Sequence, residues 1–146
     1  MQNPIALLLR ATRLWLQGRV HFAGDLESDR RVDRDEMFQA FRKVTLDPRP
    51  EQPARPGATF QVRFRFKNLS AAANRRLSAI PTSLIVAQSG FRSKTWLLGT
   101  ETGDFMGYYE FDTLLDAEAY RSSLPLAMMR RRAAEGSVVH EIAALE

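Results

Sequence analysis

The sequence predicts an α+β fold in which a sheet built from hairpins packs against helices. Three observations carry this prediction. Residues 60–67 alternate strictly between apolar and polar side chains, as expected for a strand with one buried face. Residues 90–113 contain two further alternating stretches, joined by a short acidic turn that contains a glycine. A capped helix start follows at once, with Thr113 as the cap and Asp116 three residues later as a capping-box partner.

The elements after residue 57 follow a regular order. They are a strand at 60–67, a helix at 71–84, strands at 91–99 and 105–111, a helix from 113 to about 124 that resumes to about 132, and a strand at 137–143. We expect Pro81 to end or kink the first helix and Pro125 to interrupt the second. The order β-α-β-β-α-β predicts a ferredoxin-like split-βαβ sandwich whose two helices cover one face of the sheet.

The first 57 residues are predicted to form an extension to a ferredoxin-like domain at 58–146. Its elements are an amphipathic helix at 4–17, a charged loop at 24–36, an extra strand at about 38–46 and a linker at 47–57 with four prolines and a glycine. Such a linker cannot continue a helix or a central strand. Phe38, Ala40, Val44 and Leu46 should share one side of the extra strand, which we expect to pair with the strand at 59–67.

Composition excludes several kinds of site. The chain has 146 residues, enough for one domain, with ordinary hydrophobic (45%) and charged (26%) fractions. It has no cysteine, which excludes disulfides, thiolate zinc sites and cysteine nucleophiles. It has only two histidines, and its acidic stretches lack the spacing of a calcium loop, so we predict no metal and no cofactor.

The positive charge does not predict a nucleic-acid partner. The net charge of +4 divides into +2 for residues 1–57 (ten Lys/Arg, eight Asp/Glu) and +2 for residues 58–146 (eleven and nine). Arg130–Arg132 has no interleaved aromatic residue, and a solvated helix end explains it better. No stretch reaches the ~18–20 apolar residues of a membrane span, and no secretory signal is apparent, so we expect a cytoplasmic protein.

The region from 90 to 120 carries a family resemblance. Its motifs are Gly-Phe-x-x-Lys-x-Trp at 90–96, Glu-Thr-Gly at 101–103, Gly-x-Tyr-x-Phe at 107–111 and Ala-Glu-Ala-Tyr at 117–120. With the element order, they resemble the YdhR-like monooxygenases of the dimeric α+β barrel group over roughly residues 58–146. The resemblance implies a homodimer joined through its sheets and a small hydrophobic or aromatic ligand between sheet and helices. Some members of the group oxidise phenolic or quinol-type substrates with dioxygen and without a cofactor, and the resemblance implies such chemistry here as well.

The candidate site lies on the apolar face of the sheet. In the strand order 4-1-3-2, His140 and Tyr109 would flank the Phe64 strand beneath the helices. We predict that His140 is the base that deprotonates a phenol or enol and that Tyr109 orients the substrate oxygen. The predicted ligand-binding residues are Phe64, Asn74, Ser78, Phe105, Gly107 and Tyr120. Alternatively, His140 and Tyr109 are core residues whose polar tips form local hydrogen bonds.

The opposite face of the sheet poses a charge problem. Simple alternation from Phe91 places Lys94 and Trp96 there, together with Arg63, Arg65 and Glu110. These charges need partners if a second subunit or another segment covers them. Either Glu110 pairs with an arginine or the N-terminal segment covers part of the face.

Two interpretations of function follow. The first is a cofactor-independent monooxygenase, or a related small-molecule enzyme, that acts on a hydrophobic or aromatic ligand. The second is a non-enzymatic ligand-binding or interaction module that associates weakly with a membrane surface through residues 4–17. A wide apolar arc, an arginine stripe and Trp15 suit that helix to a membrane interface, although we favour the alternative that it packs on its own domain or on a dimer mate.

Overall fold

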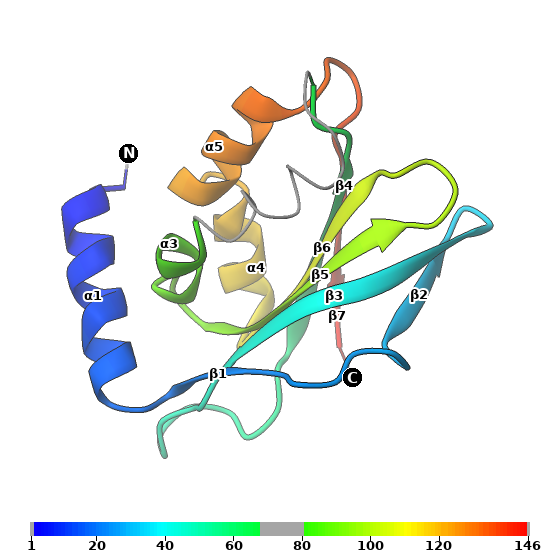
Figure 1. Cartoon of the computed structure of the whole chain (residues 1–146). Helices are drawn as coiled ribbons and strands as arrows, with labels where there is room; N and C mark the ends of the chain where they lie inside the picture. Colours follow the sequence, from blue (N-terminus) through cyan, green and yellow to red (C-terminus); the bar gives the residue numbers. More distant parts are fainter. Residues whose placement is uncertain (1, 68–80, 146) are drawn as a thin grey trace.

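The computed structural model describes residues 2–67 and 81–145, and within them helices cover one face of a twisted antiparallel sheet (Figure 1). The elements are α1 (Pro4–Leu16), β1 (Val20–Phe22), β2 (Arg30–Asp33), β3 (Glu36–Leu46), β4 (Ala58–Phe64), α3 (Thr82–Val86), β5 (Phe91–Gly99), β6 (Phe105–Phe111), α4 (Leu114–Tyr120), α5 (Leu124–Arg132) and β7 (Val139–Ala144). The sheet has the order β1-β3-β5-β6-β4-β7, and β2 also pairs with β3.

The predicted ferredoxin-like arrangement is confirmed. The neighbours β5-β6-β4-β7 form the 4-1-3-2 order with β4 in the centre, where Val62 pairs with Gly107 of β6 and with His140 of β7. Thr113 caps α4 as expected, because its hydroxyl oxygen accepts from the Asp116 N–H at 3.1 Å. Pro125 lies in the first turn of α5, where its missing N–H breaks no helical bond. Most of the helix predicted at 71–84 lies outside the described residues.

The N-terminal segment joins the sheet at a different edge from the one we predicted. Strand β3 pairs with β5, and pairing with β4 is impossible because β6 and β7 occupy both edges of β4. A β-bulge between Ala40 and Arg42 reverses the side-chain phase, so Phe38 and Val44 lie in different cores. The expected loop also contains a strand, β2, which forms a hairpin with β3.

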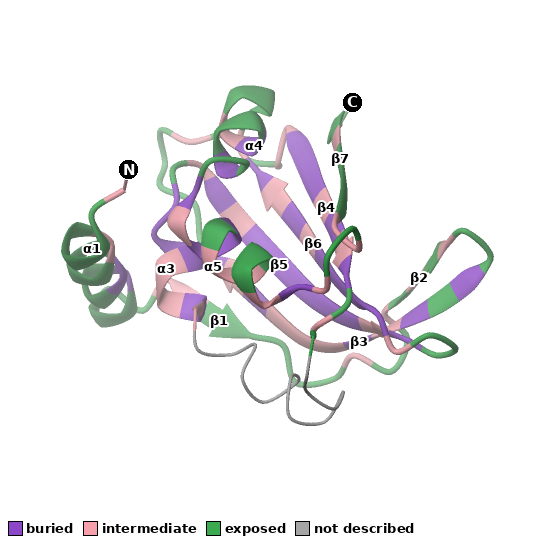
Figure 2. Cartoon of the chain, turned by 90° about the horizontal axis from the view of Figure 1, so that it is seen from above, coloured by how far each residue is buried: buried purple, intermediate pink, exposed green. Residues whose placement is uncertain are grey.

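The sheet therefore has a buried cluster on each side, and buried residues run along its central strands (Figure 2). The larger core lies between the sheet and the helices, and α1 packs against α3 through its buried Ala11 and Leu14. The smaller core contains Phe38, Ala40, Leu97 and Met106, and Leu26 from the β1–β2 connection packs on it. Thus the N-terminal segment covers part of the second face, which was one of the two alternatives.

Ion pairs hold the covering part of the N-terminal segment, here called the N-terminal cover, against the sheet. The Arg63 guanidinium binds Asp33 at 3.0 Å, Glu36 at 2.8 Å and Asp104 at 3.0 Å. Burial raises the pKa of Glu36, but hydrogen bonds from Thr102 and Glu101 and the charge of Arg63 outweigh burial, so the pKa lies below its ordinary value. Glu110 pairs with no described arginine and instead accepts from the Ser93 hydroxyl at 2.7 Å.

Candidate functional site

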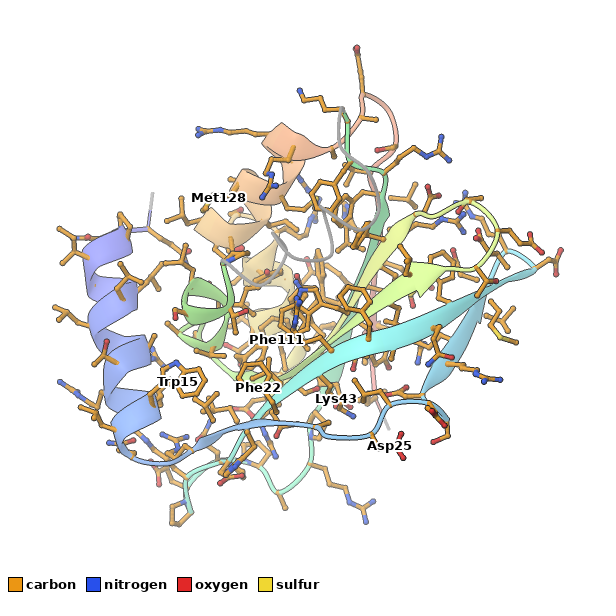
Figure 3. The ribbon with its side chains drawn as sticks, viewed as in Figure 1. Trp15, Phe22, Asp25, Lys43, Phe111 and Met128 are labelled. Carbon is orange, nitrogen blue, oxygen red and sulfur yellow. The ribbon has the colours of Figure 1, made fainter. Side chains whose placement is uncertain are left out.

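A cavity with a volume of about 70 Å³ lies between the helix-facing side of the sheet and the helices α3 and α5. Apolar side chains from both layers make most of its wall, and Met128 of α5, labelled in Figure 3, is one of them. The described lining residues are Val62, Phe64, Phe66, Pro81, Ile85, Lys94, Trp96, Phe105, Met106, Gly107, Tyr109, Tyr120, Pro125, Met128, Met129 and Arg132. An apolar cavity with a few polar groups is the usual form of a small-molecule site.

One end of the cavity is aromatic. The Phe66 ring meets Phe64 and Phe105 edge to face, with ring centroids 4.8 and 4.9 Å away. The Arg132 guanidinium lies 5.3 Å from the Phe66 centroid. This geometry favours a flat, apolar part of a ligand at this end, because further edge-to-face or stacked contacts are available to it.

The other end holds a pair of tyrosines. The Tyr120 hydroxyl donates to the Tyr109 hydroxyl at 3.1 Å, and both side chains are buried. Burial raises the pKa of Tyr109 and of Tyr120 well above the ordinary tyrosine value. Both phenols are therefore protonated at neutral pH. Because Tyr109 accepts from Tyr120, its own proton is available to a ligand oxygen.

Lys94 is the chemically distinctive residue of the cavity. Its side chain is 8% exposed, and its Nζ atom lies 4.4 Å from the Trp96 ring centroid and 4.7 Å from that of Tyr109. It forms no ion pair within residues 2–67 and 81–145. Burial, and then the charge of Arg42, lowers the pKa of Lys94 well below the ordinary lysine value. Such surroundings favour the neutral amine, which is the form of lysine that can accept a proton.

The polar groups of the cavity are donors or a base. Lys94 and Arg132 are its basic residues in the described part of the lining, which includes no carboxylate. The indole Nε1 of Trp96 is buried and has no hydrogen-bond partner among the described residues. The described residues also contain no group of three His, Asp or Glu side chains placed to hold a metal ion. This set favours a ligand that brings an acceptor oxygen or an acidic proton.

The structure gathers most, but not all, of the predicted site. Five predicted residues line the cavity: Phe64, Phe105, Gly107, Tyr109 and Tyr120. His140 does not line it. The imidazole is exposed on β7 and stacks on Phe60 at 5.7 Å with an interplanar angle of 4°. Asn74 and Ser78 lie outside the described residues. The space that Gly107 leaves is already occupied, since a Cβ there would lie 2.8 Å from Tyr109 Cε1 and 3.3 Å from Lys94 Cε.

Lys94 and Trp96 correct the sequence interpretation, which placed them on the opposite face. A β-bulge between Phe91 and Ser93 makes Arg92 an extra residue and shifts the alternation by one. Lys94 then pairs with Tyr109 and Trp96 with Gly107, so both side chains face the helices. The signal of this bulge in the sequence is the change of apolar phase from Phe91 to Trp96 and Leu98.

Comparison with known proteins identifies the fold. No protein-family model and no curated protein sequence matches the chain. A heme-degrading enzyme from Listeria monocytogenes superposes with a TM-score of 0.60 at 7% identity, covering 79% of this chain and 74% of the enzyme. An uncharacterised ferredoxin-fold protein from the same organism, related to antibiotic biosynthesis monooxygenases, gives 0.59 at 6% identity and coverages of 80% and 68%. An anthrone oxidase-like protein gives 0.53 at 16% identity, covering 75% of this chain and 56% of its own.

Proposed function

We propose that the protein binds a small aromatic or hydrophobic molecule with an acidic hydroxyl or an acidic C–H group, and oxidises it with dioxygen without a cofactor. The observation that carries this proposal is a buried lysine with a lowered pKa in an aromatic cavity, next to a tyrosine that can donate a hydrogen bond. The structural neighbours support it, because their descriptions refer to heme degradation, antibiotic biosynthesis monooxygenases and an anthrone oxidase-like protein.

The chemistry begins with proton transfer. The neutral Lys94 amine takes the acidic proton of the ligand, and Tyr109 donates a hydrogen bond to the ligand oxygen, which becomes an anion. The electron-rich anion then reacts with dioxygen. For a CH₂ group that becomes a carbonyl, one oxygen atom is inserted at carbon, and the other leaves as water with the two hydrogen atoms of the ligand.

Lys94 replaces His140 as our candidate base. A general base must lie within hydrogen-bond reach of the proton that it abstracts. Lys94 lines the cavity, whereas His140 is exposed beyond Phe60. The role that we predicted for Tyr109, orientation of the ligand oxygen, remains part of the proposal.

The size of the cavity limits the ligand. Its volume of about 70 Å³ is well below the roughly 300–1,000 Å³ of pockets for drug-sized ligands. Neither histidine of the chain lines it. The cavity therefore does not fit heme, and we propose a ligand of one or two fused rings.

Oxygen consumption tests the proposal. Wild-type protein would be supplied with 1-naphthol and hydroquinone in an oxygen electrode, beside Lys94→Met and His140→Ala. We expect Lys94→Met to lose about 10²–10⁴-fold in rate, the usual contribution of a general base, and His140→Ala to keep the wild-type rate. Loss in His140→Ala with full activity in Lys94→Met would return the role of base to His140.

A binding module without turnover is the second candidate. Among the described lining residues, Lys94 is the one that can take a proton from a ligand. In this candidate an acidic ligand forms an ion pair with Lys94 and does not react further. This candidate predicts ligand capture at one molecule per chain without oxygen uptake. Oxygen consumption that depends on Lys94 would exclude it.

We also infer that the chain forms a homodimer through the second face of the sheet, as the YdhR-like resemblance implies. Part of that face stays outside the N-terminal cover, including Val139, which is 42% exposed. Native mass spectrometry should give twice the chain mass of 16.6 kDa. A monomer at micromolar concentration would contradict the inference.

A further inference from the structure

Helix α1 presents three different faces around its axis. Successive residues are rotated by about 100°, so positions three, four and seven apart share a face. The first face holds the buried Ala11 and Leu14 and packs on α3. The second carries Arg10 and Arg13. The third is apolar and exposed, and consists of Ile5 (68% exposed), Leu8 (48%), Leu9 (68%), Trp15 (43%) and Leu16 (83%).

This apolar stripe extends beyond the helix. The Trp15 ring stacks on Phe22 of β1, with ring centroids 5.8 Å apart, and Phe22 is itself half exposed. Figure 3 shows the two rings side by side near the end of α1, and Figures 1 and 2 place the helix on the outside of the molecule. A contiguous exposed apolar surface of this kind marks an interaction site.

Charge identifies the partner. Helix α1 contains no acidic residue. A groove beside the helix is lined by Arg10, Arg19 and Arg49. Among the described lining residues, Glu51 supplies its single carboxylate. Burial, and then the charge of Arg49, lowers the pKa of Arg19, although the charges of Asp47 and Glu51 act in the opposite direction. A second copy of α1 would bring arginines against arginines, whereas an anionic bilayer offers both an apolar interior and phosphate groups.

We propose that α1 docks the protein on the surface of an anionic lipid bilayer. The stripe of Ile5, Leu8, Leu9, Trp15 and Leu16 enters the boundary between headgroups and acyl chains, and Arg13, which borders the stripe, binds lipid phosphates. A helix of this kind lies in the plane of the interface, about 5–10 Å deep. The structure has no helix, within the residues described, that is long and apolar enough to cross the bilayer. Docking is independent of the chemistry proposed for the cavity.

Vesicle binding tests the proposal with a matched control. The full chain would be sedimented with vesicles of phosphatidylcholine alone and with vesicles containing 30% phosphatidylglycerol. The variants are Leu9→Gln/Leu16→Gln on the stripe, Arg13→Gln on its flank, and Leu115→Gln. Leu115 is 78% exposed on α4, so it controls for the loss of any exposed leucine. Circular dichroism melts establish that each variant is folded.

We expect wild type to bind the anionic vesicles about tenfold more tightly than the neutral ones. The double leucine variant should lose about tenfold or more on both kinds of vesicle, the arginine variant should lose mainly the preference for anionic lipid, and Leu115→Gln should match wild type. Three results would overturn the proposal: no binding of wild type, an equal loss in Leu115→Gln, or a stripe variant that dissociates a dimer but still binds vesicles.

Discussion

The Nζ atom of Lys94 lies 4.7 Å from the centre of the Tyr109 ring, across the two paired strands β5 and β6. The contact is possible because Gly107, the next residue of β6 on the same face, has no side chain. It joins a base to a hydrogen-bond donor within one buried space.

Replacement of Lys94 by methionine should change how stability depends on pH. The folded-state pKa of Lys94 is lowered, so between that pKa and the unfolded value near 10.4 the unfolded chain binds more protons than the folded one. Wild-type unfolding free energy should therefore rise with pH in this window, by up to about 1.4 kcal/mol per pH unit relative to Lys94→Met. Urea denaturation of both proteins from pH 7 to pH 10 measures the difference. Parallel pH profiles would mean that the amine is an ordinary, solvated lysine.

Gly107→Ala should damage both stability and ligand binding. Its Cβ would lie 2.8 Å from Tyr109 Cε1, and the Tyr109 ring has little room because Phe60, Phe111 and Tyr120 pack around it. Overpacking of this kind costs about 1–3 kcal/mol. Gly24→Ala is the control, because nothing lies within 4 Å of a Cβ there. Thermal denaturation should separate the two variants, and equal melting temperatures would refute the packing argument.

Arg63→Met should destabilise the fold by about 3 kcal/mol, since it leaves the buried Glu36 and Asp104 carboxylates without their shared partner. Arg65→Met is the control, because Arg65 also binds Asp104 but its side chain is 59% exposed, and exposed pairs contribute at most about 1 kcal/mol. Chemical denaturation compares them. Similar small losses in both would show that the pairs under the N-terminal cover contribute little.

The ion pair of Glu36 also predicts that the fold loses stability in acid. The folded-state pKa of Glu36 is lowered, so its contribution is complete above the ordinary carboxyl pKa and is lost as the pH falls through the folded value. Wild type should lose more stability than Glu36→Gln between pH 5 and pH 3. Denaturation at these two pH values checks this, and an identical loss in the variant would contradict it.

Several elements were predictable because local pattern and tertiary packing agree. Strands 91–99 and 105–111 and the Thr113 cap appear where alternation and capping chemistry place them. The bulges at Phe41 and Arg92 were missed, since a bulge depends on pairing with a neighbouring strand, and the change of apolar phase after Phe91 was the local sign of the second one. Because the extra residue at Arg92 was missed, Lys94 and Trp96 were assigned to the wrong face and left out of the predicted site. His140 was assigned by its face alone, and alternation cannot show that β7 is an exposed edge strand.

The most direct test of the central claim is the absorption spectrum of bound 4-nitrophenol, whose phenol and phenolate forms absorb at different wavelengths. The titration would be made at a pH below the phenol's own pKa, with wild type and Lys94→Met. If Lys94 is a neutral base in the cavity, wild type will bind the compound and show the phenolate band, and Lys94→Met will show only the phenol form or no binding. A bound phenol without the phenolate band in wild type, or the same phenolate band in both proteins, would contradict the account.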